Sequence, residues 1–203
     1  MEPVETYKLK DGRVLEIYYD EDASNPRKEF DNLGTMICFH RRYDLGDEHD
    51  YSSDNFESWN ELESQIRRDN NVAVILPLYM YDHGVQRIKV GSFQGLLPQG
   101  HAEFDSGMIG FIFVTKQKVR AEYSAKRISK KLLARVEGYL RSEVETYDQY
   151  TSGQVYGFIV REAPTVDEDG EEAEGEEIDS CWGFYGSDPK ANGIADHVPG
   201  FIS

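Results

Sequence analysis

Apolar and polar residues alternate at the start of the chain, on both sides of Asp11-Gly12, where Tyr7, Leu9, Leu15 and Ile17 hold the apolar positions. Alternation about an Asp-Gly pair predicts a β-hairpin. Later segments are apolar almost without interruption, which is typical of buried strands. They comprise 35–40, 72–81 and 108–115, with 86–93 as a hairpin arm to 72–81. Two further strand candidates, 154–162 and 178–186, close the fold. Pro77 predicts a bulge or an edge position in its strand.

Two longer segments have the three-and-four spacing of amphipathic helices. The first is 54–69, where Asp54 is the expected N-cap and Glu57 stands three places later, as in a capping box. The second is 124–151, preceded by a short helix that begins after Thr115. Strands and hairpins interrupted by helices indicate an α+β fold with a mainly antiparallel sheet and two principal helices.

Length and composition favour one folded body. The chain has 203 residues, 39% of them hydrophobic and 12% aromatic, so we expect a single compact domain over 1–203. No window approaches the roughly 18 apolar residues of a membrane helix, and the first residues lack the apolar core of a signal peptide. These features predict a soluble, cytoplasmic protein without membrane contact.

Charge is segregated along the sequence. The net charge is -16, from 38 acidic and 22 basic residues. Ten acidic residues and no basic one lie in 162–179, and eight acidic residues and no basic one lie in 44–66. We expect the first stretch, over 163–177, to be a disordered insert in a hairpin between the last two strands, because it can bury little apolar surface. The residues 187–203 are expected to form a C-terminal tail.

One segment has the opposite charge. Eight bases and one acid, Glu122, occupy 116–135. The bases are Lys116, Lys118, Arg120, Lys126, Arg127, Lys130, Lys131 and Arg135. This segment supports the interpretation of the chain as a nucleic-acid-binding regulator, although the overall negative charge opposes it.

Several segments resemble an uncharacterised family of bacteriophage and mobile-element proteins. They read DSGMIGFIFVTKQKVRAEY, YLRSEVETYDQYTSGQVYGFIV and IDSCWGFYG, with YDEDASNPRKEFDNLGTMICFHRRYDLGD near the start. The chain departs from the family pattern at Phe104, where the family has Trp, in the acidic insert and in the tail. The resemblance implies an accessory protein of a phage or mobile element that acts in the bacterial host cytoplasm, and it carries no catalytic residues.

Few residues suggest catalysis. His101, Glu103 and Asp105 alternate and are weak candidate metal ligands. A Cys/His hydrolase is a second possibility, using Cys38 or Cys181 with His40 or with Asp82-His83. No phosphate-binding loop, nucleophile elbow or dinucleotide fingerprint is present. We therefore expect a binding protein without a cofactor rather than an enzyme.

The acidic stretches, together with the phage or mobile-element origin that the resemblance implies, favour a function in binding a basic partner. We expect inhibition of a bacterial defence system, either a CRISPR effector or a restriction enzyme. Carboxylates would occupy the partner's basic nucleic-acid channel, without direct binding of nucleic acid by this chain. The expected contact residues are Asp44, Asp47, Glu48, Asp50, Asp54, Glu57 and Glu61 on the folded body, and then Glu168, Glu171, Glu172, Glu174 and Glu176 in the insert.

Overall fold

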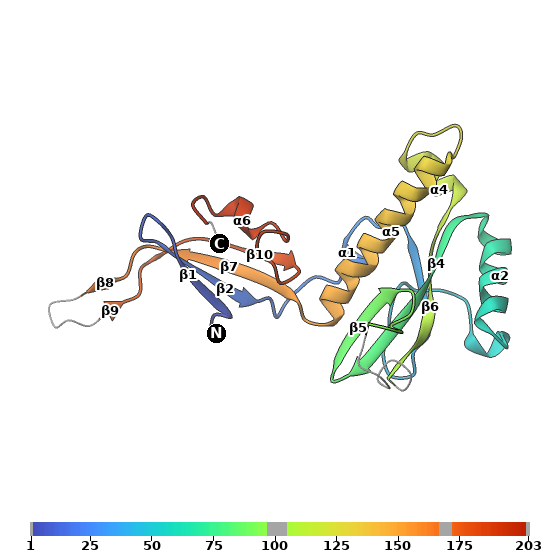
Figure 1. Ribbon diagram of the computed structural model, residues 1–203, viewed down its shortest axis with the longest axis horizontal. Coiled ribbons are helices and arrows are strands. Elements are labelled where there is room, and N and C mark those ends of the chain that lie inside the picture. Colours follow the sequence, from blue (N-terminus) through green and yellow to red (C-terminus); the bar gives the residue numbers. More distant parts are fainter. Residues whose placement is uncertain (1, 97–104, 167–171, 202–203) are drawn as a thin grey trace. The chain divides into compact units, whose positions relative to one another are not determined.

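A computed structural model describes residues 2–96, 105–166 and 172–201 of the chain. The α+β class and the mainly antiparallel pairing are confirmed, since every paired strand is antiparallel. The chain forms two compact units, each with its own four-stranded sheet (Figure 1). Unit 1 comprises Met1–Ser24 and Gln149–Ser203, and unit 2 comprises Asn25–Asp148.

The sheet of unit 1 combines the beginning and the end of the chain. Its strands, in spatial order, are β1 (Glu5–Lys8), β2 (Val14–Tyr19), β7 (Val155–Arg161) and β10 (Glu177–Tyr185). The hairpin predicted at Asp11-Gly12 joins β1 and β2. β7 and β10 form the second predicted hairpin. β2 pairs with β7, although the whole of unit 2 separates these two strands in the sequence.

The C-terminal segment belongs to the core of unit 1. Ile194, in the short helix α6 (Ile194–His197), is fully buried, and Val198 and Phe201 are buried beside Leu15 and Phe158. Phe201 also meets Tyr7 edge-on, with 4.8 Å between ring centroids. Residues 187–201 therefore cover one face of the sheet and are not a free tail.

Trp182 lies directly on Gly157, its partner in the β7–β10 ladder. A Cβ atom at Gly157 would lie 2.0 Å from Cε3 of Trp182, so only glycine admits the indole ring here. The ring also lies 6.2 Å from that of Tyr18 and stays 42% exposed. An aromatic side chain thus occupies the place that a side chain at residue 157 would take.

Unit 2 is built on the strand order β3-β6-β4-β5. The strands are β3 (Thr35–Cys38), β4 (Val72–His83), β5 (Val85–Val90) and β6 (Ser106–Thr115). The helices are α1 (Pro26–Glu29), α2 (Trp59–Asn70), α4 (Lys116–Glu122) and α5 (Lys130–Thr151), the last of which ends in unit 1. α2 and α5 flank opposite faces of the sheet (Figure 1).

Pro77 occupies a position where a strand of the sheet interior tolerates proline. β4 pairs with β5 only from Leu78 onward, and the carbonyl of Pro77 accepts a hydrogen bond from Gly91 N at 3.0 Å. The N–H that proline lacks would point to the same side as this carbonyl, toward β5, just beyond the end of the β4–β5 ladder. A register shift between Leu78 and Tyr79 supplies the predicted bulge.

Both principal helices begin later than predicted. The N-cap of α2 is Ser58, whose Oγ accepts a hydrogen bond from Glu61 N at 3.3 Å. Asp54 instead lies in a 3₁₀ turn, Ser53–Asn55. Both Asp54 and Ser58 have a glutamate three residues later, so the capping pattern alone selects either. α5 begins at Lys130 rather than at residue 124, because Ser124 adopts φ 48° and ends the preceding helix α4.

Candidate acidic binding surfaces

The loop that carries most of the predicted contact residues is attached to the core of unit 2 by Asp47. Its carboxylate accepts two hydrogen bonds from Arg27, at 2.9 Å from Nε and 2.6 Å from Nη2. It also accepts one from Met36 N at 2.8 Å. Asp47 was expected to contact a partner, but its oxygens are already occupied, so we assign it an anchoring role.

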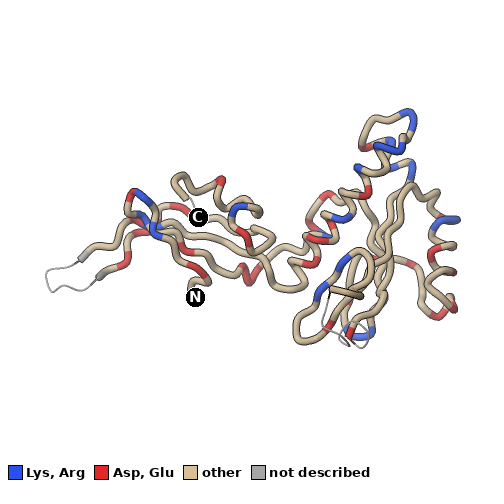
Figure 2. Tube along the Cα trace, viewed as in Figure 1, with Lys and Arg blue, Asp and Glu red and all other residues tan. Residues whose placement is uncertain are grey.

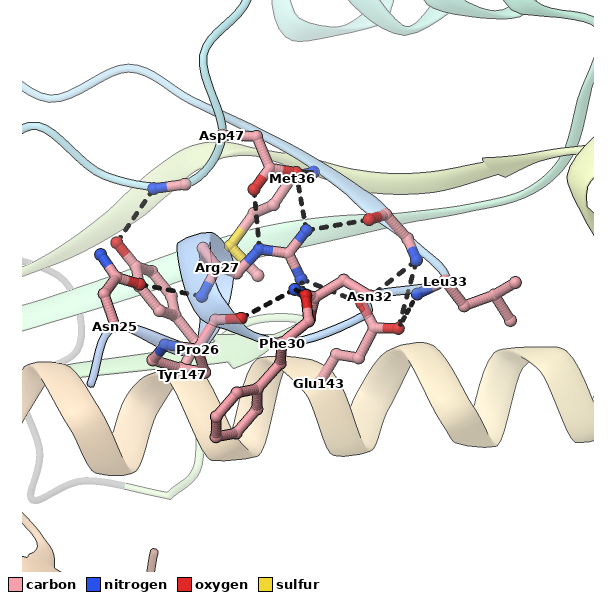
Figure 3. A network of polar contacts seen from close by, with 12 residues as sticks. Asn25, Pro26, Arg27, Phe30, Asn32, Leu33, Met36, Asp47, Glu143 and Tyr147 are labelled. Carbon is pink, nitrogen blue, oxygen red and sulfur yellow. Dashed lines mark hydrogen bonds and ion pairs between the residues drawn. The ribbon is translucent and has the colours of Figure 1, made fainter. Parts of the chain in front are cut away.

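Arg27 is the centre of this network (Figure 3). Its side chain is 1% exposed, and all five N–H donors have acceptors. Besides Asp47, these are Glu143 Oε2 at 3.0 Å, Asn32 Oδ1 at 2.9 Å and the carbonyl of Gly34 at 2.8 Å. Burial acts to lower the pKa of Arg27, but the bonds and charges of Asp47 and Glu143 outweigh it and raise that pKa. The guanidinium is therefore a permanently charged clamp.

Helix α5 holds the other side of the same network (Figure 3). Glu143 accepts hydrogen bonds from Leu33 N at 2.6 Å and from Gly34 N at 3.1 Å. One turn further along α5, the Tyr147 hydroxyl accepts from Gly46 N at 3.0 Å. Gly46 has φ 78°, and a Cβ there would lie 2.6 Å from the carbonyl oxygen of Met36. These contacts fix the loop at its start, at Gly46 and Asp47.

The other predicted acidic residues of this region remain outward and exposed. None forms an ion pair with a described basic residue, although the Glu61 carboxylate accepts a hydrogen bond from Glu57 N at 2.9 Å. We call these six residues the loop carboxylates: Asp44, Glu48, Asp50, Asp54, Glu57 and Glu61. They extend from Asp44, just before the Asp47 anchor, to the first turn of α2, so one anchored segment carries them all.

Two clefts border this loop. One, of about 680 Å³, is lined by Cys38, Asp44 and Glu48 among others, and the second, of about 750 Å³, by Asp50 and Tyr51. His49 lines both. Its Nε2 lies 3.1 Å from the carbonyl oxygen of Cys38, and that bond requires a proton on Nε2. Nδ1 is then a buried acceptor, and it has no partner among the described groups.

Part of the acidic insert is ordered in unit 1. Thr165–Val166 (β8) and Glu172–Ala173 (β9) pair as a short antiparallel ladder, where we expected disorder. Glu162 N also donates to the carbonyl of Glu176 at 2.9 Å. Glu168 and Glu171 lie outside the described residues, as does the side chain of Glu172. The insert thus continues the β7–β10 hairpin at both of its ends.

Exposed carboxylates line the base of this hairpin. Glu174 and Glu176 were predicted, whereas Glu162, Glu177 and Asp179 were not singled out. No described basic residue forms an ion pair with any of these five, which we call the hairpin carboxylates. β10 is an edge strand, where acidic side chains also discourage pairing with another chain.

The candidate catalytic groups are divided between the units. Cys38 is buried in unit 2, and burial followed by the charge of Asp47 raises the pKa of its thiol to about 12, which makes it a poor nucleophile. Cys181 belongs to unit 1. His40 stacks on Tyr43 with 4.8 Å between centroids. Cys38 thus lacks the thiolate character of a catalytic nucleophile, and Cys181 lies in a different unit from His40 and His83.

Of the three candidate metal ligands, only Asp105 lies among the described residues, and His101 and Glu103 lie outside them. Asp105 meets His83 at 3.2 Å, and the adjacent Asp82 forms an ion pair with Arg42. Among described residues, no three His, Cys, Asp or Glu side chains are grouped so as to hold a metal ion.

Charge differs sharply between the units (Figure 2). Unit 1 has 5 basic and 19 acidic residues, a formal charge of -14, whereas unit 2 has 17 and 19, a charge of -2. Basic positions gather on α4, on the α4–α5 turn and at the start of α5 (Figure 2). Within the described residues no helix has the length and apolarity needed to cross a bilayer.

No protein-family model, curated protein or solved structure matches this chain. The resemblance to phage and mobile-element proteins therefore stays a prediction.

Proposed function

We propose that this protein is a phage or mobile-element inhibitor of a bacterial defence enzyme, a CRISPR effector or a restriction enzyme. Its carboxylates bind the basic groups that otherwise hold nucleic acid. The observation that carries the proposal is the set of exposed hairpin and loop carboxylates that lack basic partners among the described residues. Carboxylates without internal partners are available to arginine and lysine of another protein.

The hairpin carboxylates are the primary contact surface in this proposal. Unit 1 contains few bases to neutralise them, and strands β8 and β9 lower the entropy cost of ordering the insert on binding. The loop carboxylates form the secondary surface. They are held by the Arg27 anchor, but they belong to a unit whose charge is nearly balanced.

Direct binding tests this proposal. Defence nucleases, stripped of nucleic acid and immobilised, are exposed to the full chain at 50 mM and 300 mM NaCl. We expect binding to at least one nuclease at low salt, weakened at least tenfold at high salt because charge contacts are screened. Cleavage of its DNA target should be inhibited over the same range of protein concentration.

Matched triple variants locate the surface. Glu174→Gln, Glu176→Gln and Glu177→Gln together should weaken binding at least tenfold, and Asp44→Asn, Glu48→Gln and Asp50→Asn together should weaken it less. The control removes three charges from exposed positions outside both surfaces, through Glu21→Gln, Glu29→Gln and Glu145→Gln. Equal losses in all three variants, or no binding to any nuclease at 50 mM NaCl, would refute the proposal.

A further inference from the structure

The structure assigns a second binding surface to unit 2, formed by the eight bases of 116–135 on α4, the α4–α5 turn and the start of α5. We propose that this basic surface binds the phosphate backbone of duplex DNA without regard to sequence. The inference does not depend on the proposed inhibitor function, which uses carboxylates elsewhere.

All eight bases of this surface are exposed. None forms an ion pair with a described carboxylate, whereas Arg27, Arg42, Arg67, Arg87 and Arg141 in the same unit all do. Lys118 Nζ donates a hydrogen bond to the carbonyl of Asn32 at 2.7 Å, but a carbonyl does not neutralise its charge. The charges at 116–135 therefore remain available to an external anion.

The backbone under these bases is held in place. Thr115 caps α4 by accepting a hydrogen bond from Lys118 N at 3.1 Å, and Val119 is fully buried beneath the helix. Across the turn, the Arg135 guanidinium lies 5.1 Å from the centroid of the Tyr123 ring. Ser129 Oγ accepts from Leu132 N at 3.2 Å where α5 begins. A fixed scaffold reduces the ordering cost of binding.

Surface chemistry selects the partner. None of the large apolar side chains exposed in the described structure lies within 116–135. The one aromatic residue of the segment, Tyr123, is half-buried and lies against Arg135, so the surface offers little on which unstacked bases could pack. Neither of the two clefts beside the acidic loop is lined by its bases. Exposed ammonium and guanidinium groups outside those clefts suit the phosphates of a duplex, whereas recognition of an RNA helix relies largely on its 2′-hydroxyls.

The overall charge of -16 opposes such binding when the chain is treated as one body. Most of that negative charge lies in unit 1, however, and unit 2, which carries the basic surface, has a charge of only -2. Within unit 2 the segment 116–135 has eight bases and one acid, a local charge of +7. Surface potentials are screened over about 8 Å at physiological salt, so local charge dominates at a contact.

The test measures fluorescence anisotropy of a labelled 30-base-pair DNA duplex with the full chain between 50 and 200 mM NaCl. We expect binding at 50 mM and a linear loss of affinity in a log–log salt plot. Joint substitution of Lys126→Gln, Arg127→Gln, Lys130→Gln and Lys131→Gln should weaken binding at least tenfold. It should also reduce the salt slope by about three to four units.

Two further variants make the result decisive. Lys28→Gln, Arg67→Gln, Arg68→Gln and Lys89→Gln together remove the same charge from other parts of unit 2 and should change affinity less than twofold. Lys126→Arg, Lys130→Arg and Lys131→Arg together keep the charge and should keep binding, with circular dichroism confirming the helices. Absence of binding at 50 mM, equal losses in the two glutamine variants, or preference for single strands, for an RNA duplex or for a second copy of the chain would overturn the inference.

Discussion

The two units contain equal numbers of acidic residues, 19 each, although unit 1 has only 79 residues and unit 2 has 124. Their bases number 5 in unit 1 and 17 in unit 2. Five arginines of unit 2 form ion pairs with described carboxylates, and Arg27 forms two such pairs in the core. Both arginines of unit 1, Arg13 and Arg161, also form ion pairs. A higher density of acids together with a lower density of bases makes unit 1 strongly anionic.

The largest expected effect tests the ionic core of unit 2. Arg27→Met leaves Asp47 and Glu143 facing one another without a cation, which should lower the free energy of unfolding by about 3–5 kcal/mol. Each unit contains one tryptophan, Trp59 in unit 2 and Trp182 in unit 1. Urea unfolding of Trp182→Phe and Trp59→Phe backgrounds therefore reports on each unit separately.

We expect Arg27→Met to shift the Trp59 transition far more than the Trp182 transition. Arg67→Met is the control, because its i,i+4 pair with Glu63 is exposed and should contribute less than about 0.5 kcal/mol. Coincident shifts of both reporters would mean that the units unfold together, which contradicts their treatment as separate bodies.

The next effect belongs to unit 1. Gly157→Ala places a methyl group where the Trp182 ring lies, so the ring must move and the free energy of unfolding should fall by about 1–3 kcal/mol. Urea unfolding followed by Trp182 fluorescence measures this. In a Trp182→Ala background, where unfolding is followed by circular dichroism, the same substitution should cost little. If Gly157→Ala lowers the free energy of unfolding by the same amount in that background, the effect comes from the backbone and not from the contact with the Trp182 ring.

The two cysteines provide a smaller comparison. At pH 8, Cys181 should react with a thiol reagent, whereas Cys38 should react only after unfolding. Because the pKa of Cys38 is raised from 9.0 to about 12, the folded state keeps a proton that the unfolded state loses. Stability should therefore fall as pH rises through this interval, by about 1.4 kcal/mol per pH unit from this group. Cys38→Ala should remove that part of the slope, and an unchanged slope would contradict it.

Sequence patterns predicted those elements whose causes are local. The Asp11-Gly12 hairpin, the β4–β5 hairpin and the Thr115 cap each depend on residues a few positions apart. The start of α2 was misplaced because Asp54 and Ser58 satisfy the same capping pattern. The sequence alone does not distinguish these two N-cap candidates, and the structure shows that α2 begins after Ser58.

Distant contacts could not be predicted in this way. Arg27 lies in a polar stretch that nothing marks as buried, and its partners Asp47 and Glu143 come from far along the chain. For the same reason Asp47 was grouped with the exposed acids, although neighbours such as Glu48 are exposed. The tail was misjudged because Ile194, Val198 and Phe201 are too widely spaced to form a clear strand or helix pattern.

The smallest expected effect is a stabilisation. Gly138 lies within α5 on its exposed side, and a Cβ there meets no atom within 4 Å. Gly138→Ala should therefore raise the free energy of unfolding of unit 2 by about 0.5–1 kcal/mol, because alanine favours the helix. The Trp59 transition in urea measures it, and a loss of stability would indicate a contact that the structure lacks.

The pairing of β2 with β7 has a consequence for synthesis of the protein. Unit 2 is continuous in sequence, so all of its strands have been made by the time Asp148 leaves the ribosome, and it can fold first. The first two strands of unit 1 must wait for β7 and β10, which are translated after unit 2. A nascent chain therefore exposes the β1–β2 hairpin until β7 and β10 have been made. Once unit 2 has folded, it shortens the loop that β2 and β7 must close.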